Sequence, residues 1–539
     1  MLKYYSRLTS SLIPGTIISI ILLTFAYLLF YTLYTSQEGT LFTRIDSHIY
    51  GLLKFTLYQA FLSTILSLLV GVLLAWALAH QSHFRGRGLL VALFSSSLVL
   101  PTLIVVFGLI GIFGRNGYLN QASLFLFDHS FGSYIYGLGG ILLAHVYLNA
   151  SFASRALLHS FESIPKEKYK LAKSLNFSVL ERFLFVEYPA LKSTLLSIGS
   201  TIFLLCFTSF AVVLLLGGSP SYNTLEVAIY EAVKLDFDIG LALKLALIQL
   251  SISAVLVVLS SSFRTELANL KTSHTLVPWK ESKIVRVVQW SIIGVFTLFF
   301  LLPLIVIFLD GIGADFGRIF KEPLFIKSLL TSLSLATASS ILTVIIALFL
   351  SNARRNFTLP TRLANRPFAK VLDAIIAFSG NLYLAIPSLV LGLGFFLMYQ
   401  KYEGSEILWS TAALMSANVL MSLPFALAVL TPAMHKTAQR YDKLAFSLGL
   451  SERQRWFDVE YPYIKSSLGY VFALAFCFSL GDLGIIALFG SDEFSTLPWY
   501  LYQLMGSYRT TDAAGVALVM LVLVLGVFVL LPRLFKEKA

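Results

Sequence analysis

A polar loop that occurs twice constrains this chain more than any other feature of its sequence. The first copy reads Leu171-Ala172-x-Ser174-Leu175-Asn176 and, nine residues later, Val186-Glu187-Tyr188-Pro189. The pattern recurs without a gap 273 residues further along, as Leu444-Ala445-x-Ser447-Leu448-Gly449 and Val459-Glu460-Tyr461-Pro462. Each copy is a polar stretch between long apolar runs. Two equivalent polar loops in an apolar chain predict two equivalent docking surfaces for a two-fold partner.

The apolar runs indicate a membrane protein. Of the 539 residues, 57% are hydrophobic and only 13% are charged, whereas soluble proteins carry about 25% charged residues. A run of about 20 apolar residues is long enough to cross a bilayer as a helix. We predict twelve spans, near residues 12–34, 55–79, 91–113, 135–153, 194–216, 241–261, 287–309, 329–350, 374–398, 409–430, 467–489 and 514–532.

The net charge of +12 reports the orientation of these spans rather than nucleic-acid binding. When the N-terminus is placed in the cytoplasm and the spans alternate, Lys and Arg gather on the inner side of the membrane. This distribution follows the positive-inside rule and predicts that both termini are cytoplasmic. Lys3 and Arg7 precede an apolar stretch that is too long for a signal peptide, which predicts an uncleaved first span. Cys206 and Cys477 both fall within spans, so no structural disulfide is expected.

The duplication extends beyond the loop to a unit of six spans. Lys54 precedes the second span as Lys327 precedes the eighth, and Thr224-Leu225 recurs as Thr496-Leu497. Because six is even, both copies begin and end on the same side of the membrane, which is a parallel repeat. Such a repeat disfavours inverted-repeat transporters but leaves open an ion-coupled transporter with two six-span halves.

We therefore predict an all-α polytopic membrane protein of three parts. These are a first repeat at residues 1–263, a cytoplasmic linker at 264–286 and a second repeat at 287–539.

The repeated loop resembles the "EAA" loop of ABC-importer permeases. The signature of that family is Glu-Ala-Ala, three residues, Gly, nine residues, and Ile-x-Leu-Pro. The matching positions here are Ala172, Asn176 and Pro189 in the first copy and Ala445, Gly449 and Pro462 in the second. Lys170 and Lys443 stand where the family has its first acidic residue. A short helix, a turn at Asn or Gly, and a second helix that ends before the proline would form a compact knob.

The resemblance implies the type I ABC-importer permease fold as a fused pseudo-dimer in the inner membrane of a Gram-negative bacterium, surrounded by lipid. It implies two copies of a cytoplasmic ABC ATPase, docked on the coupling loops at residues 164–190 and 437–463, and no nucleic acid. ATP and Mg²⁺ would bind to that ATPase. The sequence has no Gly-Lys dipeptide and therefore no Walker A motif. We expect no cofactor, no metal and no catalytic residue in this chain.

Two acidic residues near the end of each loop have two interpretations. Glu187 and Glu460 could supply the acidic contact to the ATPase that the Lys replacements remove. They could equally pair with nearby bases, Arg182 and Arg455.

Longer segments narrow the resemblance to permeases of bacterial thiamine and thiamine pyrophosphate importers. These segments are residues 209–218, 224–230, 481–490 and 496–508. The resemblance implies thiamine or its phosphates as cargo, delivered by a periplasmic thiamine-binding protein. Acidic outer stretches at 226–238 and 492–512 are candidates for docking that protein. Fused ferric-iron importer permeases are related, so ferric iron is the alternative cargo. An ion-coupled transporter and a membrane-embedded enzyme are alternatives of other classes.

Asp482 is the acidic residue well inside a predicted span, and such residues usually face a cavity or a partner. It could attract a cation in the pathway, or it could cap a broken helix beside Gly481 and Gly484. Aromatic faces also stabilise a cationic thiazolium ring. The candidate rings are those of Tyr230, Trp499 and Tyr502.

Pro101 and Pro387 occupy equivalent places in the third and ninth spans. A proline inside a helix removes a backbone hydrogen bond and kinks the helix. We predict kinks at both prolines, which could form a gate or could serve only for packing.

Overall fold

The computed structural model describes residues 2–36, 46–132, 134–218, 220–261, 281–355, 367–401 and 405–535. Within these ranges the chain is helical and contains no strand, and twelve helices are long and apolar enough to cross a membrane. The predicted all-α fold with twelve spans is confirmed. Most of the predicted linker, residues 264–280, lies outside the described residues.

We group the elements by the two predicted repeats. The first repeat contains α1 (Leu2–Thr35), α2 (Ser47–His80), α3 (Arg87–Ser95), η2 (Ser96–Leu98), α4 (Thr102–Phe113), α5 (Tyr118–Phe127), α6 (Leu138–Glu162), α7 (Lys166–Ser174), α8 (Val179–Arg182), η3 (Phe183–Glu187), α9 (Tyr188–Phe207), α10 (Ala211–Leu216), α11 (Leu225–Lys234) and α12 (Ile239–Ser261). The second contains α13 (Lys283–Ile312), α14 (Phe316–Ile319), α15 (Pro323–Arg355), α16 (Pro367–Asn381), η4 (Leu382–Ala385), α17 (Ser388–Lys401), α18 (Glu406–Ser447), α19 (Glu452–Gln454), η5 (Arg455–Glu460), α20 (Tyr461–Leu480), α21 (Ile486–Phe489), α22 (Leu497–Gly506) and α23 (Thr510–Leu534).

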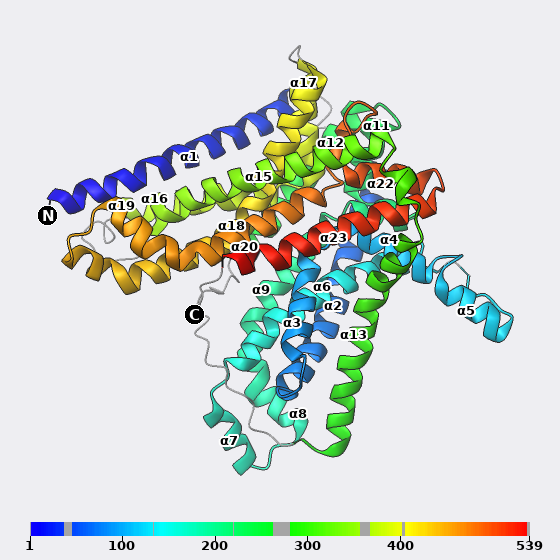
Figure 1. Ribbon diagram of the computed structural model, residues 1–539, viewed down its shortest axis with the longest axis horizontal. Helices are drawn as coiled ribbons and strands as arrows, with labels where there is room; N and C mark the ends of the chain where they lie inside the picture. Colours follow the sequence, from blue (N-terminus) through cyan, green and yellow to red (C-terminus); the bar gives the residue numbers. More distant parts are fainter. Residues whose placement is uncertain are drawn as a thin grey trace.

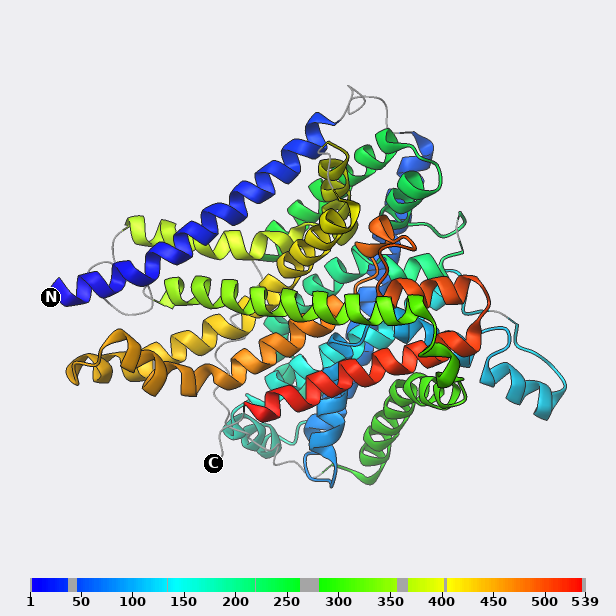
Figure 2. The ribbon, with the colours of Figure 1, turned by 45° about the horizontal axis from the view of Figure 1, so that its top comes forward.

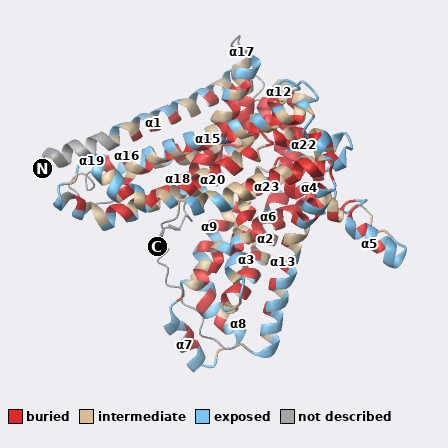
Figure 3. Ribbon diagram, in the orientation of Figure 1, coloured by how far each residue is buried: buried red, intermediate tan, exposed pale blue. Residues whose placement is uncertain are grey.

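Two arms of helices diverge from a common body (Figures 1 and 2). One arm contains α2, α3, α6 and α9 and ends at α7 and α8; the other contains α15, α16, α18 and α20 and ends at α19. The two loop regions therefore lie at separate ends of the molecule. The buried residues concentrate where the arms join, around α4, α12 and α22 (Figure 3).

Small residues allow close helix packing in the absence of a hydrophobic drive between helices in lipid. A Cβ added at Gly71 of α2 would lie only 2.7 Å from the Cβ of Ala153 on α6. The α2–α6 contact therefore depends on the missing side chain at residue 71.

The first helix of each repeat packs on the opposite repeat. Helix α1 contacts α15, α16 and α17, and a Cβ at Gly15 would clash with Ala353 of α15. Helix α13 contacts α2 and α4 as well as α23, and Gly108 of α4 faces the backbone of Pro303. The two sequence repeats are therefore not separate structural units, because the first helix of each packs against the other.

The third and ninth predicted spans are broken rather than kinked. Pro101 directly precedes α4 and Pro387 directly precedes α17, and their carbonyl oxygens accept hydrogen bonds from Val105 and Leu391. Proline has no N–H and disfavours helical geometry at the preceding residue, so the chain begins a new helix at each site. The prediction of a kink inside a continuous helix is wrong at both positions.

Candidate coupling loops and translocation site

Both copies of the repeated loop form a helical knob around a left-handed turn. Asn176 has φ +53° and Gly449 has φ +65°, as the turn residues of the motif require. The helix after each turn begins with a reciprocal capping box, formed by Ser178 with Glu181 in the first loop and by Ser451 with Gln454 in the second. Ala172 and Ala445 are buried inside the knobs.

The second helix of each knob does not end before the motif proline, contrary to the prediction. It passes through a π-helical turn, η3 or η5, into α9 or α20, and Pro189 and Pro462 occupy the first turn of these helices. A π-turn bonds each N–H five residues back instead of four. The altered bonding accommodates the prolines, which have no N–H to donate. Each knob is therefore continuous with a long helix, α9 or α20.

Glu187 lies in a buried ion cluster at the C-terminal end of α2. Its Oε1 contacts His80 Nε2 at 2.9 Å and Arg182 Nε at 3.2 Å. Glu281, which precedes α13, closes the cluster by contacting Arg182 Nη2 at 2.6 Å and His80 Nδ1 at 3.0 Å. The side chains of all four residues are at most 4% exposed. The first loop is thereby joined both to α2 and to the beginning of the second repeat.

Glu460 occupies the equivalent position in the second loop but has different partners. Arg455 Nε contacts its Oε1 at 2.6 Å, as Arg182 contacts Glu187. The remaining partner is Arg355 at the end of α15, which also pairs with Asp442 of α18. This cluster is formed entirely within the second repeat.

These clusters decide between the two interpretations of Glu187 and Glu460. Both carboxylates are buried and paired with local bases, so neither is available at the loop surface. The loop surfaces instead present exposed apolar side chains. These are Leu171, Leu175, Leu180 and Phe185 in the first loop and Leu444, Leu448 and Phe457 in the second.

Glu281 is ionised in its cluster. Burial opposes ionisation, but hydrogen bonds from His80 and Arg182 outweigh it and hold the pKa of this carboxyl below its ordinary value. The carboxylate thus contributes negative charge beside Arg182 at neutral pH.

Asp482 lies in a break between α20 and α21, where its Oδ1 accepts hydrogen bonds from the N–H groups of Gly484 (3.1 Å) and Ile485 (3.4 Å). Its Oδ2 is buried and has no hydrogen-bond partner among the described residues. A Cβ at Gly481 would lie 2.9 Å from Pro101, and one at Gly484 would lie 2.7 Å from Ser388 Oγ. The break that carries Asp482 therefore packs against both proline breaks.

The three predicted pathway aromatics come together on α11 and α22. The hydroxyls of Tyr230 and Tyr502 interact electrostatically across the two repeats, and the rings of Trp499 and Tyr502 have centroids 5.5 Å apart. Phe210, beside the break between α9 and α10, extends this cluster with an edge contact to Tyr230 at 5.4 Å. Asp482 takes its hydrogen bonds from its own break rather than from these rings.

The sequence analysis missed the polar group at the corresponding break of the first repeat. His145 bonds to Ser63 Oγ through Nδ1 and to Ser209 Oγ through Nε2, both at 2.9 Å. At the 273-residue spacing, His145 corresponds to Asn418 and Ser209 corresponds to Asp482. That alignment was the available signal, because it places a serine where the other repeat has a carboxylate.

Part of the acidic outer surface that was predicted for partner docking is buried. Glu226 of α11 is fully buried and accepts a hydrogen bond from Gln249 Nε2. Asp512 is also buried and pairs with Arg318 and Arg509. Neither carboxylate is therefore exposed for contact with a partner protein.

Comparison with known proteins gives consistent matches. Residues 357–535 match the family described as binding-protein-dependent transport system inner membrane component. The thiamine transport system permease protein of Salmonella typhimurium is 37% identical over 530 residues, covering 97% of this chain and 96% of the relative. The Escherichia coli protein of that name is 35% identical over 97% of this chain and 96% of its own length. The Brucella abortus protein is 36% identical over 90% of this chain and 88% of its own length.

Proposed function

The chain belongs to the family of binding-protein-dependent transport system permeases, the multi-pass inner-membrane components of ABC importers, and from this premise we propose that it carries thiamine into the cell. The observation that supports this cargo is the 35–37% identity to thiamine transport system permeases along nearly the whole chain. These relatives do not favour ferric iron. The family relationship implies a binding protein and an ATPase as partners. We further propose a Gram-negative inner membrane with both termini in the cytoplasm.

Each loop receives one copy of the ATPase, so two copies bind per chain. The exposed leucines and the Phe185 and Phe457 rings supply the apolar contact surface. Such exposed apolar patches are typical of protein interaction sites. ATP and Mg²⁺ are held by the ATPase, and this chain contributes no cofactor or catalytic residue.

The loops act as rigid levers on the spanning helices. Each knob continues through a π-turn into α9 or α20 and is fixed to α2 or α15 by its buried glutamate. When ATP binding draws the two ATPase copies together, the arms close and the body opens toward the periplasm. The periplasmic thiamine-binding protein then releases its cargo between α11 and α22.

Asp482 and the aromatic cluster receive the cationic cargo. An unpartnered carboxylate oxygen attracts the thiazolium charge, and the faces of Tyr230, Trp499 and Tyr502 stabilise it further. Pro101 and Pro387 form the gate, because the breaks that they begin pack against the break carrying Asp482.

Uptake of labelled thiamine tests this function in cells that lack their own thiamine importer. The chain is expressed with its ATPase and binding protein, beside a Leu175→Asp/Leu448→Asp loop variant. We expect thiamine uptake by the wild type and none by the loop variant, with the variant present in the membrane at normal amount. Ferric uptake without thiamine uptake would contradict the cargo, and undiminished uptake by the variant would contradict the docking role.

A further inference from the structure

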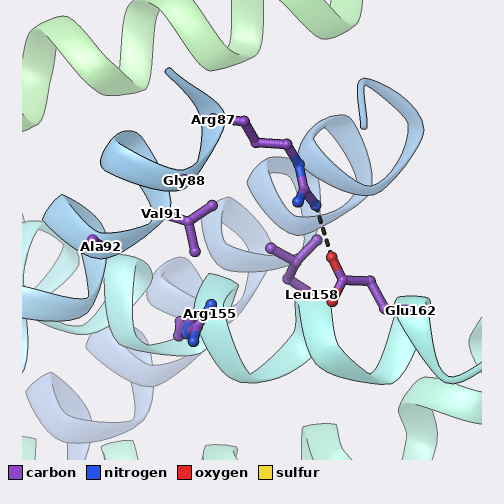
Figure 4. A pocket seen from close by; sticks show the side chains of 7 residues that line it. All are labelled: Arg87, Gly88, Val91, Ala92, Arg155, Leu158 and Glu162. Carbon is purple, nitrogen blue, oxygen red and sulfur yellow. Dashed lines mark hydrogen bonds and ion pairs between the residues drawn. The ribbon is translucent and has the colours of Figure 1, made fainter. Parts of the chain in front are cut away.

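A small cavity lies beside the beginning of α3 on the arm that carries the first loop. It has a volume of about 220 Å³, and Arg87, Gly88, Arg155 and Glu162 supply its polar lining (Figure 4). Val91 and Leu158 form the apolar wall between them. Cavities that hold whole drug-sized molecules are about 300–1,000 Å³, so this one suits a single chemical group.

The cavity carries an excess of positive charge. Arg87 Nη2 pairs with Glu162 at 2.8 Å, and its guanidinium also faces the carbonyl oxygen of Leu78, which fixes its position. Arg155 makes no hydrogen bond or ion pair within the described part of the chain and is exposed to the cavity. Glu162 therefore neutralises one arginine, and the charge of the other remains available.

The first turn of α3 adds to this positive potential. Gly86 begins the helix with φ +91°, and a Cβ at Gly88 would meet no atom within 4 Å, so the backbone of the first turn is open. The N-terminus of a helix attracts anions through its free N–H groups and its dipole. Helix terminus and arginine thus face the same cavity.

Arg155 lies near the other repeat, where the residues that correspond to Arg155 and Glu162 are of different types. The charge of Arg155 acts on the hydroxyl of Tyr470 on α20, which belongs to the opposite arm. At the 273-residue spacing, Arg155 corresponds to Ala428 and Glu162 to His435. The second repeat therefore has no arginine at the position that corresponds to Arg155.

We propose that this cavity binds a phosphate ester. Arg155 and the first turn of α3 contact the phosphate oxygens, while the Arg87–Glu162 pair holds the wall in place. Two sources share this chemistry: the phosphate tail of a phosphorylated thiamine moving between the arms, which rests on the proposed function, and the headgroup of an anionic lipid. Arginine suits both because its guanidinium donates two parallel hydrogen bonds to phosphate.

Binding of labelled inorganic pyrophosphate tests the site directly on the full chain in phosphatidylcholine nanodiscs. We expect Arg155→Gln to weaken binding roughly tenfold or more, as loss of a charged hydrogen bond predicts. Arg155→Lys should retain part of the affinity because it keeps the charge. Arg85→Gln is the matched control, since it removes an exposed arginine near Arg87 but outside the cavity, and it should bind like the wild type.

Two further measurements identify the source of the phosphate group. Competition by thiamine pyrophosphate, but not by thiamine, would assign the site to phosphorylated cargo. Retention of phosphatidylglycerol by the wild type in mixed-lipid nanodiscs, lost in Arg155→Gln, would assign it to lipid; either result supports a phosphate-ester site. Equal pyrophosphate affinity and equal lipid retention in the wild type and Arg155→Gln would overturn it. Failure of the wild type to take up thiamine would reject the proposed function, while pyrophosphate binding would still decide the cavity.

Discussion

The two coupling loops have closely similar motifs but are attached to the protein in different ways. In the first, Pro165 separates α7 from α6; in the second, the equivalent residue is Ala438 and α18 runs unbroken from the membrane into the knob. The first loop is also tied to the other repeat through Glu281, whereas the second draws its partners Arg355 and Asp442 from its own repeat. The duplicated motif thus determines the structure of each knob. Residues outside the motif determine which helices the knob is attached to.

Removing the central base of the second cluster should have the largest effect. Arg355→Met leaves Asp442 unpaired and Glu460 with Arg455 alone, and uncompensated buried charge costs about 3–5 kcal/mol. The free energy of unfolding in detergent, measured by denaturant titration, should fall by that amount.

The neighbouring Arg354→Met is the control for this loss. Its pair with Asp373 is partly exposed, with side chains 22% and 32% accessible, so it should cost about 0–1 kcal/mol. Equal losses in the two variants would refute a special role of the buried cluster.

Exchanging the residues that distinguish the loops should have the next largest effect. Ala438→Pro places a proline at a buried position inside the continuous helix α18 and should cost about 3 kcal/mol. Pro165→Ala should change stability little, because that position already lies between helices. Thermal unfolding of the two variants checks the difference, and a larger loss in Pro165→Ala would show that continuity of α18 is unimportant.

A third experiment gives the helix breaks at Ser209 and Asp482 the same residue. Asp482→Ser copies the residue at the corresponding position, Ser209, and removes the carboxylate that we assign to the cationic cargo. Thiamine uptake should fall roughly tenfold, while Ser209→Ala should reduce it less. Equal reductions of uptake in the two variants would show that Asp482 only caps the helix and does not bind the cargo.

The smallest effect should be the pH dependence that Glu281 gives to the first loop. Its pKa is lowered in the folded protein, so its contribution to stability is present above the unfolded pKa of about 4.3 and is lost as pH falls through the folded value. Glu281→Gln should remove this part of the acid sensitivity. Melting temperatures between pH 7 and pH 3 measure it, and identical pH profiles would show that Glu281 contributes nothing.

The local sequence was sufficient to predict the spanning helices and the turns of the knobs. Hydropathy predicts the twelve helices, and the repeated motif predicts the left-handed turns at Asn176 and Gly449, because both signals act within a few turns of helix. The breaks at Pro101 and Pro387 were misinterpreted since a hydropathy window averages over a short interruption.

Long-range contacts account for what the sequence did not predict. His80, Glu187 and Glu281 meet only after folding, and nothing in their spacing marks them as partners. The packing of α1 and α13 on the opposite repeat could likewise not be predicted from the repeat pattern, because that pattern describes each repeat separately. By contrast, aligning the two repeats residue by residue would have identified the His145–Ser209 group opposite Asp482.

The packing of α1 on α15, α16 and α17 has a consequence for biosynthesis. The ribosome delivers α1 to the membrane before these three helices, because all of them are encoded after the linker. Through the synthesis of the entire first repeat, α1 must remain in lipid or against the insertion machinery, held by its own hydrophobicity alone. The apolar stretch Leu12–Thr35 therefore keeps α1 in the membrane before its partners exist, as well as in the final structure. A truncated chain that ends before α15 would leave this helix without these neighbours.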